Sequence, residues 1–272
     1  MRIVILAMDD PLYTNQFIKQ IIDKKQKDIV GFFYVSKGNR MTIRKDQSRI
    51  SYMFALFLIM GPVYFILNSL TTLRHKFQCV LSQKTRLIPD PMVKAYSEKK
   101  GIPSFQIGNP NHPDSLCIIR DLRPDVIINQ SQSIIKKSLI DIAQIGVINR
   151  HNALLPRNRG RLTPFWILYN NEVETGVSIH FVNEGIDDGD IIIQKKYKVR
   201  ETDTFNSLVK KNYKLADSAI IEALDKLSLK NCTLIQNDIN QATYNTTPDI
   251  RHAWTYRKKR ILSRWNLKIK RG

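Results

Sequence analysis

The sequence predicts an α/β protein built on an open, mostly parallel sheet with helices on both faces. Short apolar runs rich in β-branched residues alternate with longer amphipathic segments along most of the chain. Polar residues also gather directly after the apolar run at 146–149. Ligands of open parallel sheets bind at the carboxyl ends of the strands, so this position is where a site is expected.

Each expected element follows from its own residue pattern. Apolar or alternating runs bounded by turn residues predict strands at 2–7, 28–35, 104–107, 125–129, 146–149, 176–182 and 191–199. Helical spacing of apolar residues predicts helices at 15–24, 91–100, 113–122, 136–144 and 204–229. This order is Rossmann-like. The turn after the first strand, however, lacks a Gly-x-Gly-x-x-Gly loop, which argues against a dinucleotide ligand.

The chain is strongly basic. It has 43 Lys and Arg against 24 Asp and Glu, a net charge of +19, which predicts a polyanionic neighbour such as nucleic acid, an anionic membrane or a phosphorylated substrate. Cys79, Cys117 and Cys232 are odd in number and far apart, so we expect free thiols in a reducing cytoplasm and no metal site. The first strand follows Met1 directly, so no signal peptide is expected.

An apolar insertion at 36–85 interrupts the alternation. Tyr52–Leu70 carries no charge and is flanked by basic residues, namely Arg40, Arg44, Lys45 and Arg49 before it and Arg74 and Lys76 after it. A single membrane crossing would fit the length, but it would separate strands of one sheet. Gly61-Pro62 also breaks the run. We therefore expect two short half-helices in a re-entrant or interfacial hairpin; the alternative is a hairpin packed on the protein itself or on a partner subunit.

The C-terminal extension at 231–272 ends in a basic, aromatic tail. The tail has no acidic residue from 251 onward and nine basic ones, namely Arg251, Arg257, Lys258, Lys259, Arg260, Arg264, Lys268, Lys270 and Arg271, with Trp254, Tyr256, Trp265 and Leu267 between them. This composition suits an anionic lipid surface. Together with the hairpin it predicts a cytoplasmic protein held on the inner face of the membrane. RNA is the rival partner, and a solvated, disordered tail is the remaining alternative.

Three polar residues are placed for chemistry. Asn149 and His151 lie two apart at a strand end, so both can face one substrate. Asp187 lies in a Gly-Ile-Asp-Asp-Gly-Asp turn after the neighbouring strand, where its carboxylate can fix one tautomer of His151 and favour its charged form. Taken singly, each residue is equally explained as a strand-end or turn residue.

Residues 149–190 resemble the catalytic domain of the 10-formyltetrahydrofolate-dependent formyltransferases, which act on sugar amines, methionyl-tRNA or glycinamide ribonucleotide. The shared pattern comprises Asn149-x-His151, Leu154-Leu155-Pro156 with Gly160, Trp166, Gly176-Val177-Ser178-Ile179-His180 and Asp187-Asp188-Gly189-Asp190. Ala153 stands where many members have Ser or Gly. The likeness covers roughly 1–35 and 90–225, so we expect a catalytic domain over 1–230 that contains the insertion.

The resemblance implies transfer of a formyl group from 10-formyltetrahydrofolate to a primary amine, without a metal. Asn149 and protonated His151 would stabilise the developing oxyanion, and Asp187 would orient His151 and pass protons. His180 is expected to be structural. The folate would lie against the main chain of two segments, Gln132, Ser133, Ile134 and Ile135, and Val182, Asn183, Glu184 and Gly185. Candidates to bind a phosphate or the folate glutamate tail are Arg157, Arg159 and Arg161, which could equally be a solvated basic face.

The expected acceptor is an amino sugar or related amine, on a nucleotide or lipid carrier, in cell-envelope or polysaccharide synthesis. Residues 240–248 and Pro164-Phe165-Trp166 look similar to the small sugar-amine formyltransferases. Methionyl-tRNA is the alternative, with the basic tail as an RNA contact. A formyl-folate hydrolase is disfavoured because Met1 begins the first catalytic strand, and a non-catalytic membrane adaptor because all three catalytic positions are intact. The oligomeric state is left open.

Overall fold

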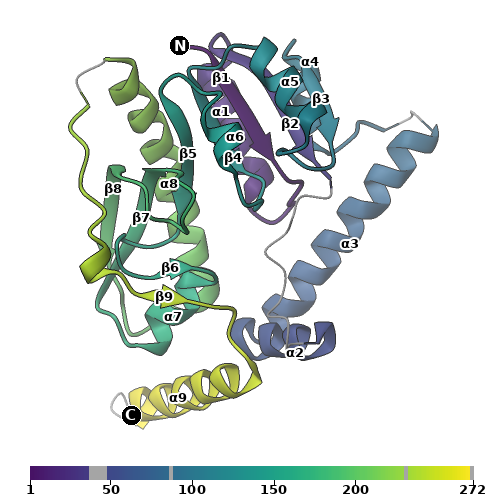
Figure 1. Ribbon diagram of the computed structural model, residues 1–272. Helices are drawn as coiled ribbons and strands as arrows, with labels where there is room; N and C mark the ends of the chain where they lie inside the picture. The colour runs from purple at the N-terminus through teal and green to yellow at the C-terminus, as the bar shows by residue number, and fades with distance from the viewer. Residues whose placement is uncertain (37–47, 86–87, 230–231, 270–272) are drawn as a thin grey trace.

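A computed structural model describes residues 1–36, 48–85, 88–229 and 232–269, the last seven as backbone only. Their elements are β1 (Ile3–Ala7), α1 (Thr14–Lys25), β2 (Ile29–Val35), α2 (Arg49–Met60), α3 (Pro62–Thr85), α4 (Val93–Lys99), β3 (Ser104–Ile107), α5 (Pro113–Asp121), β4 (Val126–Gln130), α6 (Lys137–Ile140), β5 (Gly146–His151), β6 (Arg159–Gly160), α7 (Thr163–Tyr169), β7 (Glu174–Phe181), β8 (Ile191–Lys198), α8 (Phe205–Ser228), η1 (Ile239–Gln241), β9 (Tyr244–Asn245) and α9 (Ile250–Ile269). Figure 1 labels them along the chain.

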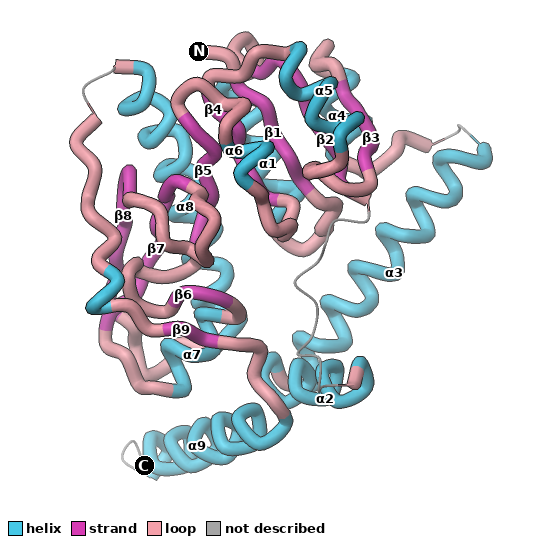
Figure 2. The backbone as a smooth tube through the Cα atoms, in the orientation of Figure 1, coloured by secondary structure: helices cyan, strands magenta, loops and turns pink. Residues whose placement is uncertain are grey.

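Seven strands form the central sheet, in the order β3-β2-β1-β4-β5-β7-β8 (Figures 1 and 2). The first five strands of this order pair in parallel, whereas β7 and β8 are antiparallel to their neighbours. The predicted mostly parallel α/β sheet is thereby confirmed. Both β4 and β5 end beside each other, with Asn129 opposite Asn149.

The alternation along β1 explains why both faces of the sheet need helices. Ile3 and Ile5 belong to a buried cluster with side chains of α1 and α8, while Val4 and Leu6 belong to another with side chains of α5 and α6. A parallel strand buried on both faces reads as an unbroken apolar run, which is how β1 appears in the sequence.

Two helices on the body differ from the prediction. Helix α6 is a single turn, because Gln144 and Ile145 donate backbone hydrogen bonds to Pro124 and Asp125 and so lead the chain straight into β5. Helix α7 was not predicted. Its first turn contains Pro164, a residue well suited to a helix start, and Phe165 is fully buried.

The insertion bends where the sequence predicts. Gly61 has a φ of +82° and ends α2, and Pro62 begins α3. The second helix is not a short half-helix, however. It has 24 residues and continues past the apolar run to Thr85, since no Gly or Pro interrupts the polar part.

Helix α2 packs on the protein itself, as the alternative reading of the hairpin proposed. Its residues Ala55, Leu58 and Ile59 are buried in a cluster with side chains of α7, α8 and α9. No helix within the described ranges is both long and apolar enough to cross a membrane. The basic residues Arg40, Arg44 and Lys45 lie outside the described residues.

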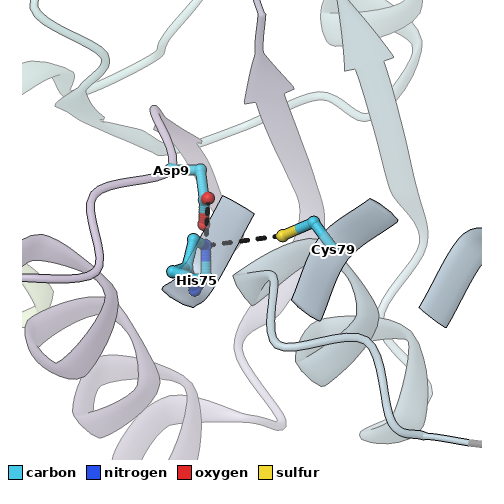
Figure 3. Close-up of side chains that lie close together, drawn as sticks. All are labelled: Asp9, His75 and Cys79. Atoms are coloured by element: carbon cyan, nitrogen blue, oxygen red, sulfur yellow. Dashed lines mark hydrogen bonds and ion pairs between the residues drawn. The ribbon is translucent and has the colours of Figure 1, made fainter. Parts of the chain in front are cut away.

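A polar tether joins α3 to the loop after β1 (Figure 3). His75 Nε2 lies 2.5 Å from Asp9 Oδ2, and Cys79 Sγ lies 3.6 Å from the same nitrogen. Donor atoms of these three residues fall within 4.8 Å of one another, a set that can also bind a metal ion. Burial, together with the charges of Asp9 and Asp90, raises the pKa of the Cys79 thiol to about 11. Binding of a metal ion to this set would displace the thiol proton.

The described part of the C-terminal extension is folded onto the body. Ile235 pairs with Ile191, and β9 pairs in parallel with β6. Helix α9 follows and buries Ala253 and Tyr256 against α2 and α7. Figures 1 and 2 show α2 and α9 close together at one end of the molecule. Within the tail, Lys270 and Arg271 lie outside the described residues, and so do the side chains of Arg264, Trp265, Leu267 and Lys268.

Candidate active site

A cavity of about 730 Å³ opens at the carboxyl ends of β4 and β5. Asn149, His151 and Asp187 all line it. The structure also brings all eight residues predicted to face a folate to its wall, namely Gln132, Ser133, Ile134, Ile135, Val182, Asn183, Glu184 and Gly185. Residues far apart in the sequence thus share the one edge of the sheet where a site was expected.

The side-chain amide of Asn149 is oriented by a chain of hydrogen bonds. Arg150 Nε donates to Gln130 Oε1 at 3.2 Å, and Gln130 Nε2 donates to Asn149 Oδ1 at 3.0 Å. The carbonyl oxygen of Asn149 is therefore occupied, and its amide nitrogen is left to donate into the cavity. The sequence analysis missed Gln130, whose one signal is its place at the end of a predicted strand.

Gln130→Glu is expected to lower kcat about tenfold with little change in KM for the formyl donor. A carboxylate cannot donate to Asn149 Oδ1, so the Asn149 amide loses the bond that fixes its orientation. The measurement is steady-state formyl transfer, with Gln144→Glu as the matched control, since Gln144 is exposed at the opposite end of β5. Equal kcat values for the two variants would contradict the orienting role.

His151 is buried and held at both ring nitrogens. Its Nε2 donates to the carbonyl oxygen of Asn158 at 2.7 Å. Its Nδ1 lies 3.4 Å from Asp187 Oδ2. The Asn158 carbonyl fixes a proton on Nε2, so Nδ1 is the ring nitrogen that faces the carboxylate.

A strained turn positions Asp187. The residue has a φ of +50°, which is costly for a non-glycine residue. Asn237 Nδ2 holds the turn by donating to the carbonyl oxygens of Asp187 and Gly189, each at 2.9 Å. The turn needs glycine at 189, because an added Cβ would lie 2.1 Å from the Phe181 oxygen. No local sequence signal connects Asn237 to this turn, and it was also missed.

Asp187 keeps its negative charge despite its burial. Burial by itself raises the pKa of this carboxyl group. The charges of His151 and His180, the Gly160 amide hydrogen bond at 2.9 Å and the charge of Arg159 outweigh burial and hold the pKa below its usual range. Asp187 is therefore a carboxylate at neutral pH, available to pair with a protonated His151.

His180 lies on the other side of this carboxylate. Its Nδ1 donates to the Phe181 carbonyl oxygen at 2.7 Å, and its Nε2 lies 3.6 Å from Asp187 Oδ1. Burial lowers the pKa of His180 to about 4. Its ring is therefore neutral at physiological pH, which accords with a structural rather than an acid–base role.

His180→Gln is expected to make protein stability less sensitive to acid. The folded pKa of about 4 lies below the usual 6.5, so the stabilising contribution of the neutral ring is complete above pH 6.5 and is lost as the pH falls towards 4. That loss is on the order of 3 kcal/mol. Urea unfolding at pH 7 and pH 4.5 should show a smaller decrease in the free energy of unfolding for the variant. An equal decrease in both proteins would exclude His180 as the group responsible.

The three predicted arginines separate in the structure. Arg161 lines the cavity, where it lies near Tyr52 of α2. Arg157 is exposed and is not among the residues of the cavity wall. Arg159 is buried, and its guanidinium donates to Asn237 Oδ1 at 2.9 Å. The structure thus places Arg161 at the site and Arg159 in the support of the Asp187 turn.

The insertion supplies a further wall of the cavity that the sequence analysis did not assign. Tyr52, Met60 and Asn68 of α2 and α3 face the space, together with Tyr13 and Tyr213 from the body. These two tyrosines stack at 5.1 Å between ring centroids.

Comparison with known proteins finds a matching family and similar sequences. The family model described as formyl transferase matches residues 1–224. The methionyl-tRNA formyltransferase of Kosmotoga olearia is 35% identical over 160 residues, which are 58% of this chain and 51% of that protein. This chain therefore spans about half the length of that relative.

Solved structures share the fold. Glycinamide ribonucleotide transformylase 1 from Symbiobacterium toebii superposes with a TM-score of 0.57 at 14% identity, covering 88% of this chain and 94% of that one. The N-formyltransferase from Helicobacter canadensis, in complex with folinic acid and dTDP-3-aminofucose, gives 0.54 at 16% identity, covering 92% and 72%. At these identities the likeness concerns the fold alone.

Proposed function

Because the chain belongs to the formyl transferase family, we propose that it transfers the formyl group of 10-formyltetrahydrofolate to a primary amine. The observation that carries this proposal is the convergence of Asn149, His151 and Asp187 on one cavity. Backbone positions suited to a folate form another part of the same wall. A hydrolase would use the same three side chains, so the presence of an acceptor wall supports transfer over hydrolysis.

The cavity fits a folate donor. Its 730 Å³ lies within the usual range for a site that encloses an organic ligand. The main chain of Gln132–Ile135 and Val182–Gly185 would hold the pterin. The side chain of Ile135, at the end of the first segment, is buried. The Helicobacter canadensis neighbour, solved with folinic acid, supports a folate in this fold.

Asn149 and His151 would stabilise the charge that develops on the formyl oxygen when the amine attacks. The orientation of Asn149 places a neutral N–H donor in the cavity without further rearrangement. A His151 protonated at Nδ1 adds positive charge from the same strand. Donors fixed in advance in a buried site commonly contribute about 3 to 4 kcal/mol each to lowering a barrier of this kind.

Asp187 would complete the proton transfers. Its carboxylate lies within 3.4 Å of His151 and is charged at neutral pH. It can stabilise imidazolium and, directly or through water, accept the proton that the attacking amine releases. The departing folate nitrogen then receives a proton through the same pair of groups. No residue has to form a covalent bond to the formyl group.

We infer that the acceptor is an amino sugar or a related envelope precursor on a nucleotide or lipid carrier. Tyr52 and Asn68 offer the cavity a hydroxyl and an amide, beside Met60, and such groups can hydrogen-bond to the hydroxyls of a sugar. Arg161 offers a cation for a carrier phosphate, and Tyr13 and Tyr213 offer aromatic faces. The dTDP-3-aminofucose in the Helicobacter canadensis neighbour supports this class of acceptor. Free thiols at Cys79, Cys117 and Cys232 fit a cytoplasmic reaction.

Methionyl-tRNA is the second candidate. It is favoured by the curated relative from Kosmotoga olearia, which is itself a methionyl-tRNA formyltransferase. The basic helix α9 offers a surface for phosphate contacts. An amine at the end of a tRNA would have to enter past α2 and α3, and this makes the smaller acceptor our preferred one.

The test follows a labelled formyl group. The purified protein is incubated with formyl-labelled 10-formyltetrahydrofolate and a host extract separated into lipid, nucleotide-sugar and tRNA fractions. Label in the lipid or nucleotide-sugar fraction is expected, and it should be absent with His151→Ala. Label in tRNA alone would replace the amino-sugar acceptor with methionyl-tRNA. Release of free formate in every fraction would overturn the transfer itself.

A further inference from the structure

Helix α3 presents its apolar side to the solvent and a largely polar side to its own protein. The inward residues include Asn68, Thr72, His75 and Ser82. On the outward side, spaced alternately by three and four residues, six apolar side chains are between 51% and 66% exposed, namely Val63, Ile66, Leu70, Leu73, Phe77 and Val80. This spacing places them in one line along the helix, which we call the outer stripe.

The tether fixes the outer stripe in this outward direction. His75 bonds Asp9 on the body, and residues at positions 66, 70, 73 and 77 follow the opposite side of the helix. Figures 1 and 3 show α3 reaching from α2 towards the β3 side of the sheet, with His75 and Cys79 turned to the body. An exposed apolar line of this length marks a surface that another molecule covers.

The charged side chains of α3 itself are all basic. Arg74, Lys76 and Lys84 lie on α3, and none of α2, α3 and α9 contains an acidic residue. Helices α2 and α9 also carry exposed apolar side chains, at Ile50, Met53 and Phe54 of α2 and at Trp254, Ile261 and Leu262 of α9. The partner must therefore accept apolar side chains and supply negative charge.

We propose that the outer stripe of α3 lies on an anionic lipid membrane, parallel to its surface. Lipid headgroups supply the negative charge that the three helices lack, and the acyl boundary takes up the apolar side chains. Arg74 and Lys76 can extend their charged ends to the headgroups while their stems stay with the apolar side chains. A second copy of the chain would instead bring cationic helices together with no acidic residue to offset them.

This attachment differs from a spanning or re-entrant segment. Helix α2 is packed on the protein, so α3 offers the continuous apolar line, which is about 26 Å long from Val63 to Val80 at the usual helical rise. The same insertion lines the cavity through Tyr52 and Asn68, so the cavity lies next to the attached helix. The attachment does not depend on which acceptor the cavity takes.

Vesicle binding by the full chain tests the proposal. Sedimentation with vesicles of equal parts phosphatidylcholine and phosphatidylglycerol is expected to carry the protein down, and pure phosphatidylcholine to carry much less. The triple variant Leu70→Ser, Leu73→Ser, Phe77→Ser should bind the mixed vesicles at least about a hundredfold more weakly. Replacing Arg74, Lys76 and Lys84 with Gln should weaken binding about fivefold per cation, and less at high salt.

A matched variant controls for the loss of apolar surface as such. Val173, Leu229 and Ile239 are 80%, 73% and 73% exposed and lie outside α2, α3 and α9, so changing these three to Ser should leave vesicle binding unchanged. Circular dichroism checks that each variant is folded. The proposal is overturned if the wild-type protein stays in solution with mixed vesicles, or if both triple Ser variants bind equally. A wild-type dimer that the outer-stripe variant dissociates, without vesicle binding, would assign the surface to a second copy instead.

Discussion

Replacing Asn149 or His151 with alanine is expected to lower formyl transfer at least about a hundredfold while the protein stays folded. Asn149→Ala removes the N–H donor that Gln130 orients, and His151→Ala removes the imidazole beside Asp187. Both side chains face the cavity at a strand end, so the sheet does not depend on them. The measurement is turnover with the acceptor fraction identified by the label, at saturating donor.

The pair also allows a sharper comparison. Residues that act on one oxyanion should be non-additive, so the double variant should lose much less than the product of the two single effects. His112→Ala is a suitable control, because His112 is exposed on the surface and its ring contacts only Asp114 nearby. Near-normal turnover in both single variants, with folate still bound, would remove the active-site assignment.

Asp187→Asn should likewise lower turnover at least about a hundredfold, while the turn keeps almost the same backbone conformation. The amide oxygen can still accept the Gly160 hydrogen bond, and Asn237 still holds the backbone. What disappears is the negative charge that stabilises protonated His151. Because the pKa of Asp187 is held below its usual range, the wild-type group is charged throughout the neutral region and the full loss should appear at pH 7.

Asp188→Asn is the control for Asp187→Asn, because it removes a carboxylate from the same turn without changing the residue that faces His151. Asp188 is the next residue in the same loop and is not part of the cavity wall. Its variant should keep most of the activity. If Asp187→Asn and Asp188→Asn lowered turnover by the same factor, the loss would arise from a changed loop conformation and not from removal of the carboxylate beside His151.

Local patterns were enough to predict the sheet, while the resemblance to the formyltransferase motif singled out the three side chains that the structure brings to one cavity. The apolar run of β1 and the alternation of β7 are properties of neighbouring residues, and so is the two-residue spacing of Asn149 and His151. Their placement at strand ends then follows from how parallel sheets are built. The glycines on either side of Asp187 likewise predict a turn at this position.

Contacts between distant segments were not predictable in this way. Asn237 supports Asp187 across 50 positions, and α9 packs on α2 from nearly 200 positions away. The insertion shows the same limit within one helix. Its uncharged run suggested a short half-helix, but only the packing of α2 and the bond from His75 to Asp9 decide which side of α3 is left open. Nothing in the spacing of residues alone determines these choices.

The pairing of β6 with β9 affects the order in which the parts of the protein can fold during synthesis. Arg159 and Arg161 donate backbone hydrogen bonds to Thr243 and Asn245, so the loop that carries Gly160 is held by a segment made about 80 residues after it. A growing chain can complete its sheet once β8 has been synthesised, since domains fold as they emerge. The loop beside Asp187 must still wait for residues 243–245. The site at Asp187 is therefore completed only after residues 243–245 have been synthesised, later than the central sheet.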